Sequence, residues 1–360
     1  MTDRNGRTAA RPGSGKRVWL VVCGLLVVLA TAMALPLIGY MAVDQAQAQE
    51  QPQQASDDQV VNPRAAYWRE VREGVKGYTT AEGAEAGVLI QNGGQNWRQI
   101  RNGPVANYGA WAMIALIVVL AAYHLFTGGY KMPDRTGRKI LRWPGVDRFI
   151  HWYTAVLFIL LAITGLSILW GRAVLIPVLG KDGFAAWAGI AKPIHDYTAL
   201  FFAAGLVVMI AKWMHHNIPK GYDIKWLLKG GGYLGGGHPP AGFSNAGEKA
   251  WFWTLALFGG AMIVSGFYLL FPNLGTERPG MQLANIVHGV SALVCCIFGL
   301  MHIYLGTIGS EGALEAMVSG EVDEQYAKNH HPLWYDEVMK GKGGYSGGGA
   351  VSPAPASPEK

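Results

Sequence analysis

Two histidines lie within one apolar stretch near the C-terminus, "ANIVHGVSALVCCIFGLMHIYLG", residues 284–306. Histidine is rare in membrane spans and there indicates a functional partner. His288 and His302 are fourteen positions apart, which on an ideal helix brings them to within roughly 40° of one face and separates them by about 21 Å along the axis. The spacing places two imidazoles on one side of a helix, near opposite membrane surfaces.

Two further histidines begin apolar runs earlier in the chain. His151 lies in "DRFIHWYTAVLFILLAITG" and His195 in "KPIHDYTALFFAAGLVVMI". Consecutive spans cross a membrane in opposite directions, so His151 starts on the side where His302 ends, and His195 starts on the side where His288 lies. Depth therefore predicts two pairs, His151 with His302 and His195 with His288.

Two imidazole pairs at two depths suit two bis-histidine haems b, because imidazole is a good axial ligand and each iron takes one ligand from either face. A single metal ion would need all four histidines at one depth. A proton relay usually includes membrane carboxylates, and Asp196 is the only one in these runs. Hydrogen-bonded bridges between helices are a further alternative.

The remaining histidines give weaker signals. His124 has no obvious partner at its depth, so we expect a structural or interfacial role. Two adjacent pairs, His215 with His216 and His330 with His331, follow the ends of apolar runs. We expect them in solvated loops that dock against a partner, with proton supply as the alternative.

The elements that position these histidines are membrane helices. The chain has 360 residues, of which 51% are hydrophobic and only 15% charged, which is too apolar for an ordinary soluble protein. Six runs reach the roughly 20 residues that a membrane-spanning helix needs. They cover Val18 to Val43, Asn107 to Tyr130, Phe149 to Gly171, Pro193 to Ala211, Trp251 to Asn273 and Met281 to Ser310. The sequence predicts an all-α integral membrane protein.

Domain boundaries follow from these runs. Residues 1–48 read as a signal peptide or an N-terminal membrane anchor, since a basic leader precedes the run and "AQA" at 46–48 would suit signal peptidase. Residues 49–105 form a polar extracytoplasmic segment, and 106–130 an extra transmembrane helix. Residues 131–310 hold four helices, and 311–360 form a tail whose glycine-rich end we expect to be disordered.

The distribution of lysine and arginine orients the chain. The loops 128–148 and 212–250 carry eleven basic residues, against four in the loops 172–192 and 274–280. By the positive-inside rule the first two loops and the C-terminal tail are cytoplasmic. The net charge of +6 thus concerns topology, and no nucleic-acid-binding motif is present. The three cysteines, Cys23, Cys295 and Cys296, form no CxxCH or CxxC motif, which excludes a c-type haem and a four-cysteine iron–sulfur cluster in this chain.

Several motifs in order resemble one family, the cytochrome b (gamma) subunits of membrane-bound formate dehydrogenases. They are "DRFIHW", "HHNIP", "IKWLL", "FSNAGEKAWFW", the His288 and His302 pair, and "AKNHHPLWY", between about 140 and 340. The resemblance implies a four-helix haem-binding bundle in the bacterial inner membrane. It also implies that His151 with His302, and His195 with His288, ligate two haems b, which agrees with the pairing by depth.

The same resemblance implies a quinone site, for menaquinone or ubiquinone, beside the cytoplasmic haem at Asn245, Gly247 and His302. The family typically has glutamine where this chain has Glu248, so that this position departs from the quinone-site pattern. An acid beside a quinone could also deliver protons. Residues 1 to about 135 lie outside the compact family pattern and resemble a longer form of the subunit.

As partners the resemblance implies a molybdopterin catalytic subunit, which oxidises formate, and an iron–sulfur subunit, which passes the electrons on in anaerobic respiration. Two alternatives remain at this point. One is the related cytochrome b subunit of a nickel–iron hydrogenase or a thiosulfate-type reductase. The other is a membrane protein without redox function whose histidines bridge helices.

Overall fold

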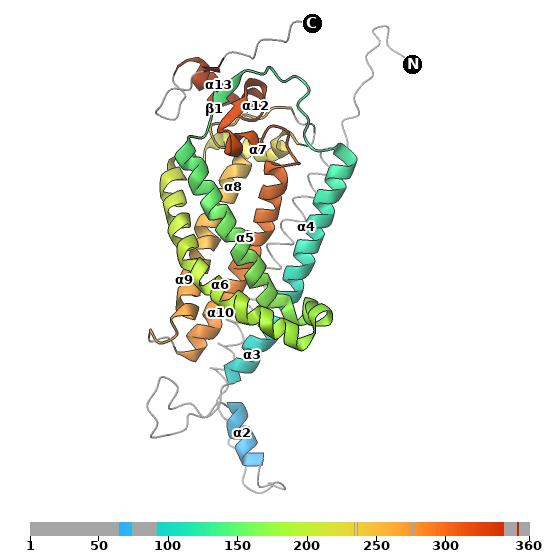
Figure 1. Ribbon diagram of the computed structural model, residues 1–360, viewed down its shortest axis with the longest axis vertical. Coiled ribbons are helices and arrows are strands. Elements are labelled where there is room, and N and C mark those ends of the chain that lie inside the picture. Colours follow the sequence, from blue (N-terminus) through green and yellow to red (C-terminus); the bar gives the residue numbers. More distant parts are fainter. Residues whose placement is uncertain are drawn as a thin grey trace.

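The computed structural model describes residues 65–73, 92–233, 235, 237–274, 277–341 and 351–352. Five helical segments in this part of the chain are long and apolar enough to cross a membrane, and they stand side by side in a bundle (Figure 1). The prediction of an all-α multi-pass membrane protein is confirmed. The expected first span at 18–43 and the signal peptide lie outside the described residues.

The five spans are built from nine helical segments, one of which, α6, is kinked. The first span joins α3 (Asn92–Ile100), a π-helical turn η2 (Arg101–Val105) and α4 (Ala106–Thr127). The second and third are α5 (Gly145–Val174) and α6 (Ile176–Trp213). The fourth joins α8 (Ala246–Thr254), a second π-helical turn η5 (Leu255–Gly259) and α9 (Gly260–Leu270), and the fifth is α10 (Arg278–Gly306). A short helix α2 (Ala65–Glu73) precedes them.

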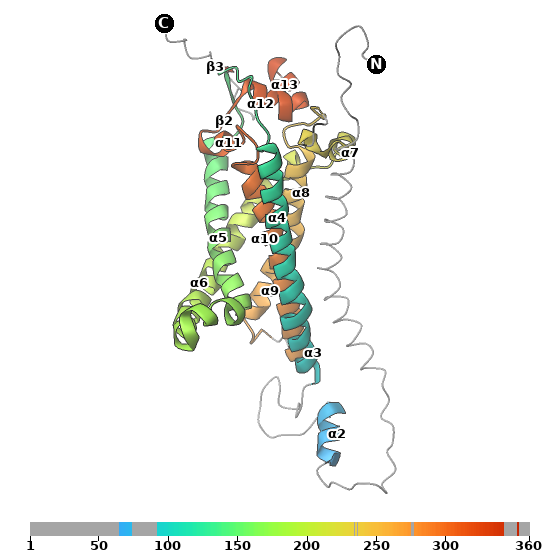
Figure 2. The ribbon, with the colours of Figure 1, turned by 90° about the vertical axis from the view of Figure 1, so that its right-hand side faces the viewer.

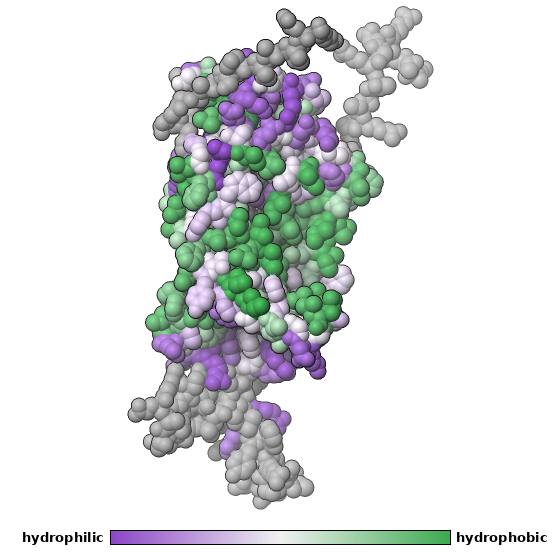
Figure 3. All heavy atoms as spheres, viewed as in Figure 1, coloured by the Kyte–Doolittle hydropathy of each residue, from purple (hydrophilic) through white to green (hydrophobic). Residues whose placement is uncertain are grey.

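On the face shown in Figure 3, apolar side chains form a broad belt across the middle of the bundle, between polar ends. Large exposed hydrophobic residues on α4, α5 and α6, such as Ile117, Val156 and Val207, face outward in this belt. Because lipid tails are as apolar as these side chains, such exposure is what a membrane span requires.

Helix α10 is the centre of the bundle. Half of its most apolar window is buried, against 22% or less in the other spans. One apolar cluster on α10 packs against α4 and includes Val105, Ile286 and Leu293. Another cluster, which includes Leu161, Phe202 and Cys295, joins α10 to α5 and α6. The helix that carries two of the four histidines is thus held on several sides.

A polar layer, which we call the cap, covers one end of the bundle (Figure 2). It consists of β1 (Lys139–Leu141), α7 (Gly221–Leu228), α11 (Glu315–Val318), β2 (Glu321–Asp323), α12 (Glu324–His330) and α13 (Pro332–Met339), with β3 (Val351–Ser352). The strand order is β2-β1-β3, and β1 pairs antiparallel with β2 in the register Ile140 to Val322. Two short 3-10 turns, η3 (Met214–His216) and η4 (Gly230–Gly232), complete the connections.

The cap differs in part from what the sequence predicted. The tail end that we expected to be disordered contributes Val351–Ser352 to the sheet, so that this prediction is wrong for those two residues. The buried side chains of Ile140 and Val322, both 0% exposed, explain why the loop before α5 and the segment after α10 associate.

The expected loop at 172–192 is largely helical. Helix α6 begins at Ile176 and is interrupted at Gly180, whose φ of 71° breaks the helix. In Figure 1 the first part of α6 lies across the end of the bundle opposite the cap before the helix turns along the bundle. Gly171 permits this fold-back, because a Cβ there would lie 2.1 Å from the Phe184 ring. Because charged residues such as Lys181 interrupt the apolar pattern, the sequence did not indicate a helix here.

The C-terminal end of the segment 49–105 also differs from the prediction of a polar extracytoplasmic segment. Residues 92–105 are helical and continue into α4, so that the first span reaches from Gly93 to Thr127. Trp97 and Ile100 pack against the apolar cluster on α10. This part of the chain belongs to the bundle.

Candidate functional site

His195 and His288 face each other across the bundle at the end away from the cap. His195 lies on α6 and His288 on α10, and their ring centroids are 6.2 Å apart with an interplanar angle of 74°. We call these two residues the cavity pair.

His151 and His302 form a second pair nearer the cap, which we call the cap pair. Their ring centroids are also 6.2 Å apart, with an interplanar angle of 60°. Trp251 of α8 stacks on His302 at 5.3 Å with nearly parallel rings. Among the described residues, the buried Nδ1 atom of His151 has no hydrogen-bond partner.

Hydrogen bonds fix the rings of the cavity pair. The Nδ1 atom of His288 lies 3.0 Å from the carbonyl oxygen of Met262, which can only accept. The Nδ1 atom of His195 lies 2.9 Å from Thr164 Oγ1, whose own hydrogen is directed to the carbonyl of Leu160. Both Nδ1 atoms must therefore donate, which leaves each Nε2 with a lone pair. Such bonds through the second nitrogen orient histidine ligands of metals.

Two glycines make room for these rings. A Cβ at Gly165 would lie 3.0 Å from Cε1 of His195, and a Cβ at Gly266 would lie 3.0 Å from Cε1 of His288. Each glycine sits on the helix that packs against the ring. Any larger side chain would push an imidazole out of place.

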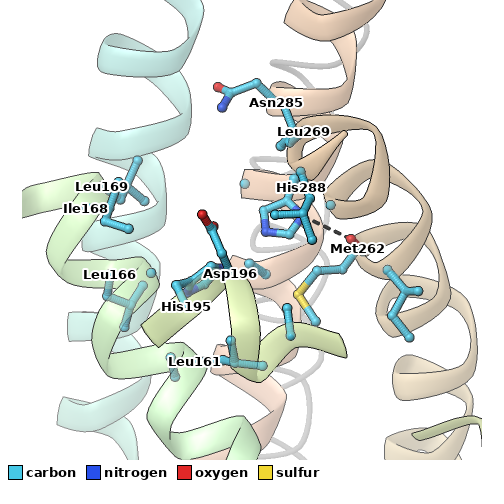
Figure 4. A pocket seen from close by; sticks show the side chains of 18 of the residues that line it. Leu161, Leu166, Ile168, Leu169, His195, Asp196, Met262, Leu269, Asn285 and His288 are labelled. Atoms are coloured by element: carbon cyan, nitrogen blue, oxygen red, sulfur yellow. Dashed lines mark hydrogen bonds between the residues drawn. The ribbon is translucent and has the colours of Figure 1, made fainter. Parts of the chain in front are cut away.

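A cavity of about 380 Å³ opens around the cavity pair. Figure 4 shows His195 and His288 extending into it, with Asp196 beside them and Asn285 toward one end. The walls are apolar, with Leu161, Leu166 and Met262 among them. A mostly apolar cavity with a few polar groups at one rim is the usual form of a cofactor site.

The ring distances test the haem hypothesis. Imidazole nitrogens bind first-row metals at about 2.0–2.1 Å, so that two rings on opposite sides of one iron have centres roughly 6 Å apart. Both pairs have this separation. In the described part of the chain, no group of three or more histidine, cysteine or acidic side chains is placed to hold a metal ion. The geometry fits two axial ligand pairs and not a single four-histidine metal site.

The other histidines occupy different settings. His124 does have a partner, since its Nδ1 lies 3.2 Å from the hydroxyl of Tyr304. His215 is exposed, and His216 stacks on Phe243 at 4.1 Å. These positions are compatible with structural roles at the ends of helices.

The expectation that His330 and His331 lie in a solvated loop is wrong. They are 5% and 0% exposed inside the cap. His331 Nδ1 lies 3.0 Å from the Gly242 carbonyl. Burial lowers the pKa of His330 to about 3, with the neighbouring His331 adding to the effect. Burial, with Arg142 as a further cause, likewise puts the pKa of His331 well below its usual value. Both rings are neutral because the cap excludes water from them.

The residues expected near a quinone lie at the start of α8. Asn245 caps this helix, accepting from the backbone of Glu248, while the Glu248 carboxylate accepts from the backbone of Asn245. This reciprocal pair is a capping box. Arg142, which is 3% exposed, donates to both Glu248 oxygens at 3.0 Å. A Cβ at Gly247 would lie 3.0 Å from the Trp226 ring.

Sequence reasoning missed Arg142, Thr164 and the two glycines. Arg142 looked like one basic residue among several in a polar loop. Thr164, Gly165 and Gly266 are common residue types in membrane helices, and only the packing of α5 and α9 against the histidine rings gives them a role.

Comparisons with known proteins cover the part of the chain that contains both pairs. Residues 142–320 match the family described as prokaryotic cytochrome b561. The chain is 29% identical over 210 residues to the nitrate-inducible formate dehydrogenase cytochrome b556(Fdn) subunit of Escherichia coli. The aligned part covers 56% of this chain and 93% of that protein. It is 28% identical over 213 residues to the formate dehydrogenase cytochrome b556 subunit of Haemophilus influenzae, covering 57% of this chain and 85% of the relative.

Proposed function

Since residues 142–320 match the family described as prokaryotic cytochrome b561, we propose that this protein is the membrane-anchoring dihaem cytochrome b subunit of a formate dehydrogenase. The two facing histidine pairs, each with ring centroids 6.2 Å apart, carry the proposal. A cytochrome b family implies haem b, and the similarity to formate dehydrogenase cytochrome b556 subunits supports the choice of complex.

Each pair would hold one haem b, and haem b supplies one-electron transfer when bound. His195 and His288 would hold the haem at one level of the bundle, and His151 and His302 the haem at the other. Two histidine ligands for each iron would suit electron transfer rather than oxygen binding. The helix α10 sets the separation of the two levels, about 21 Å for fourteen residues.

The residues around the pairs have supporting tasks. Thr164 Oγ1 accepts a hydrogen bond from Nδ1–H of His195, and the Met262 carbonyl accepts one from Nδ1–H of His288. These bonds would direct Nε2 of each ring toward the iron. The walls of the cavity near Leu161 and Leu166 are apolar, which suits a carrier that exchanges electrons without exchanging ligands.

We assign the cap end to the cytoplasm. Both loops rich in lysine and arginine, 128–148 and 212–250, lie at this end, next to β1 and α7. The cap pair is then the inner pair and the cavity pair the outer one. Electrons would enter at the outer pair from an iron–sulfur subunit, which receives them from a molybdopterin subunit that oxidises formate. The bacterial inner membrane is the compartment that fits this arrangement.

The electrons would reduce a membrane quinone, menaquinone or ubiquinone, near Asn245, Gly247 and His302. The amide of Asn245 and the backbone at Gly247 lie at the start of α8, and Trp251 of the same helix stacks on His302. The side chain of Glu248 is 36% exposed, so that a carboxylate is accessible where the reduced quinone needs protons. The Arg142 partner keeps this carboxylate in place at the end of the helix.

The experiment is a reduced-minus-oxidised absorbance spectrum of membranes that contain the chain and its partners. We expect formate to reduce b-type haem bands rapidly, and a pyridine haemochrome assay to give two haems per chain. Reduction by hydrogen but not by formate would assign the protein to a nickel–iron hydrogenase. Absence of b-type bands even with dithionite would refute the cytochrome function.

A further inference from the structure

We propose that Arg101, which lies outside the family-matched residues, binds a propionate carboxylate of the haem at the cavity pair, and that the extra N-terminal span thereby completes this haem pocket. The inference rests on the proposed haem at His195 and His288. It gives a role to a part of the chain for which the family resemblance offers none.

The extra span packs against the bundle through η2 and the first part of α4. Val105 is 1% exposed and lies against α10. A Cβ at Gly109 would lie 2.6 Å from a methyl group of Leu293, which is itself 0% exposed. Trp170 of α5 donates from Nε1 to the carbonyl of Ala106 at 3.0 Å. This span is therefore held against α5 and α10, two of the helices that border the cavity.

Arg101 and Val105 reach the cavity from this span. Both belong to the π-helical turn η2 and line the cavity together with His195 and His288. One turn earlier, Trp97 donates from Nε1 to Asn285 Oδ1 at 3.2 Å, and Asn285 also lines the cavity. Turns of π-helix within α-helices are frequent at functional sites, and this one places a guanidinium at the cavity wall.

The charges around the cavity leave Arg101 as the uncompensated cation. The charged residues that line it are Arg101, Lys192 and Asp196. Lys192 and Asp196 form an ion pair on successive turns of α6, so that together they add no net charge. Among the described residues, the side chain of Arg101 bonds only to the neutral amide oxygen Oδ1 of Asn102, at 2.8 Å.

Haem b supplies the matching anion. It carries two propionate carboxylates at one edge, and an unpaired carboxylate at the edge of the hydrocarbon region is costly. Arginine is the side chain best suited to this partner, because its planar fork donates two parallel hydrogen bonds to a carboxylate. Asn285 lines the same cavity toward one end (Figure 4), and its amide nitrogen can donate to the same carboxylate.

The test compares Arg101→Gln with Arg98→Gln in the complete complex. Arg98 lies one turn away on α3, is exposed and does not line the cavity, so that both variants lose one positive charge from the same face of the membrane. Haem content is measured by pyridine haemochrome, and the midpoint potential of each haem by spectroelectrochemical titration. Arg101→Met is made alongside, because it keeps an unbranched side chain and removes every donor.

We expect Arg101→Gln and Arg101→Met to lower the midpoint potential of one haem or to remove that haem, while the other haem is unaffected. A cation beside the propionate favours the reduced, more negative haem, and its loss favours the oxidised form. Arg98→Gln should match the wild type in both measurements.

Unchanged potentials and two haems in both Arg101 variants would overturn the inference, as would an equal shift in Arg98→Gln. Either result leaves the proposed function intact, because two haems would still be bound. A wild-type complex without haem would instead refute the proposed function itself.

Discussion

The rings of His195 and His288 meet across the bundle at the same 6.2 Å centroid separation as those of His151 and His302, although different helices supply the partners. Helix α10 contributes one member to each pair, while α6 and α5 contribute the others. The repeated distance at two depths matches what two similar ligand pairs on one shared helix would require.

Alanine substitutions should separate the two haems. We expect His288→Ala and His302→Ala each to lower the haem content from two per chain to one, because each removes one axial ligand from a different pair. The pyridine haemochrome assay on the purified complex measures this. His124→Ala is the control, since His124 bonds to Tyr304 and belongs to neither pair. Two haems in either ligand variant would contradict the assignment.

The hydrogen bond from His195 to Thr164 should tune the haem potential. Thr164→Val keeps the shape of the side chain and removes the acceptor, so that the imidazole becomes a weaker electron donor. A hydrogen bond contributes about 1 kcal/mol, which for one electron corresponds to a rise in midpoint potential of up to about 40 mV.

Thr254→Val is the matched control for that prediction. Its hydroxyl donates in the same way to the carbonyl four residues earlier, on Ala250, and among the described residues it makes no bond to a histidine. Redox titration of both variants decides the matter. A potential that falls, or that rises equally in the control, would rule out tuning by Thr164.

A methyl group at Gly266 should disturb the cavity pair. Gly266→Ala places a Cβ 3.0 Å from Cε1 of His288, whereas at Gly260, on the same helix, a Cβ meets nothing within 4 Å. In helices alanine is intrinsically more stable than glycine by roughly 0.5–1 kcal/mol. We therefore expect Gly260→Ala to keep or raise the melting temperature, while Gly266→Ala loses haem at the cavity pair. Equal haem content in the two variants would show that the ring has room to move.

The cap should loosen in mild acid. His330 and His331 are buried and neutral in the folded cap, with the pKa of His330 lowered to about 3. In the unfolded cap a histidine has a pKa of about 6.5. The stability that the cap gains by burying these neutral rings is therefore fully present above neutral pH. It falls as the pH drops below 6.5, because only the unfolded form takes up the proton. At pH 5 the loss is about 2 kcal/mol for each histidine.

Hydrogen exchange of the amides in α12 and α13, corrected for the intrinsic rate at each pH, measures this loosening. The control is His330→Phe, which fills the space between the rings of Tyr130 and Tyr326 without a titrating group. This variant should show about half the pH dependence of the wild type. Equal protection of the wild-type cap at pH 7 and pH 5 would disprove the prediction.

The sequence predicted the spans and the histidine pairing because both depend on local composition. Apolar runs marked α4, α5 and α10 to within a few residues, and the position of each histidine in its run assigned its depth. The pairs that depth predicted are the pairs that the fold brings together. Whether they ligate haem stays a prediction that spectra must test.

What the sequence could not predict depends on contacts between distant segments. The helix before Lys192 folds back because the Phe184 ring packs against Gly171. The periodicity of the sequence does not predict this contact. His330 and His331 resembled a polar loop, yet they are buried because the tail folds over the start of α8. The place of Arg101 at a cavity wall required the packing of the extra span on α10.

The pairing of β1 with β2 fixes an order of events during synthesis. β1 precedes α5 and β2 follows α10, so that four spans must be made and inserted before the two strands can meet. A chain that stalls after Gly306 already has all four pair histidines, but the backbone N–H groups of Arg142 and Trp143 still lack their acceptor, the carbonyl of Gly320. Such a chain presents an open strand edge beside the membrane, the kind of exposed feature on which aggregation begins. Closure of the cap therefore marks a completed subunit.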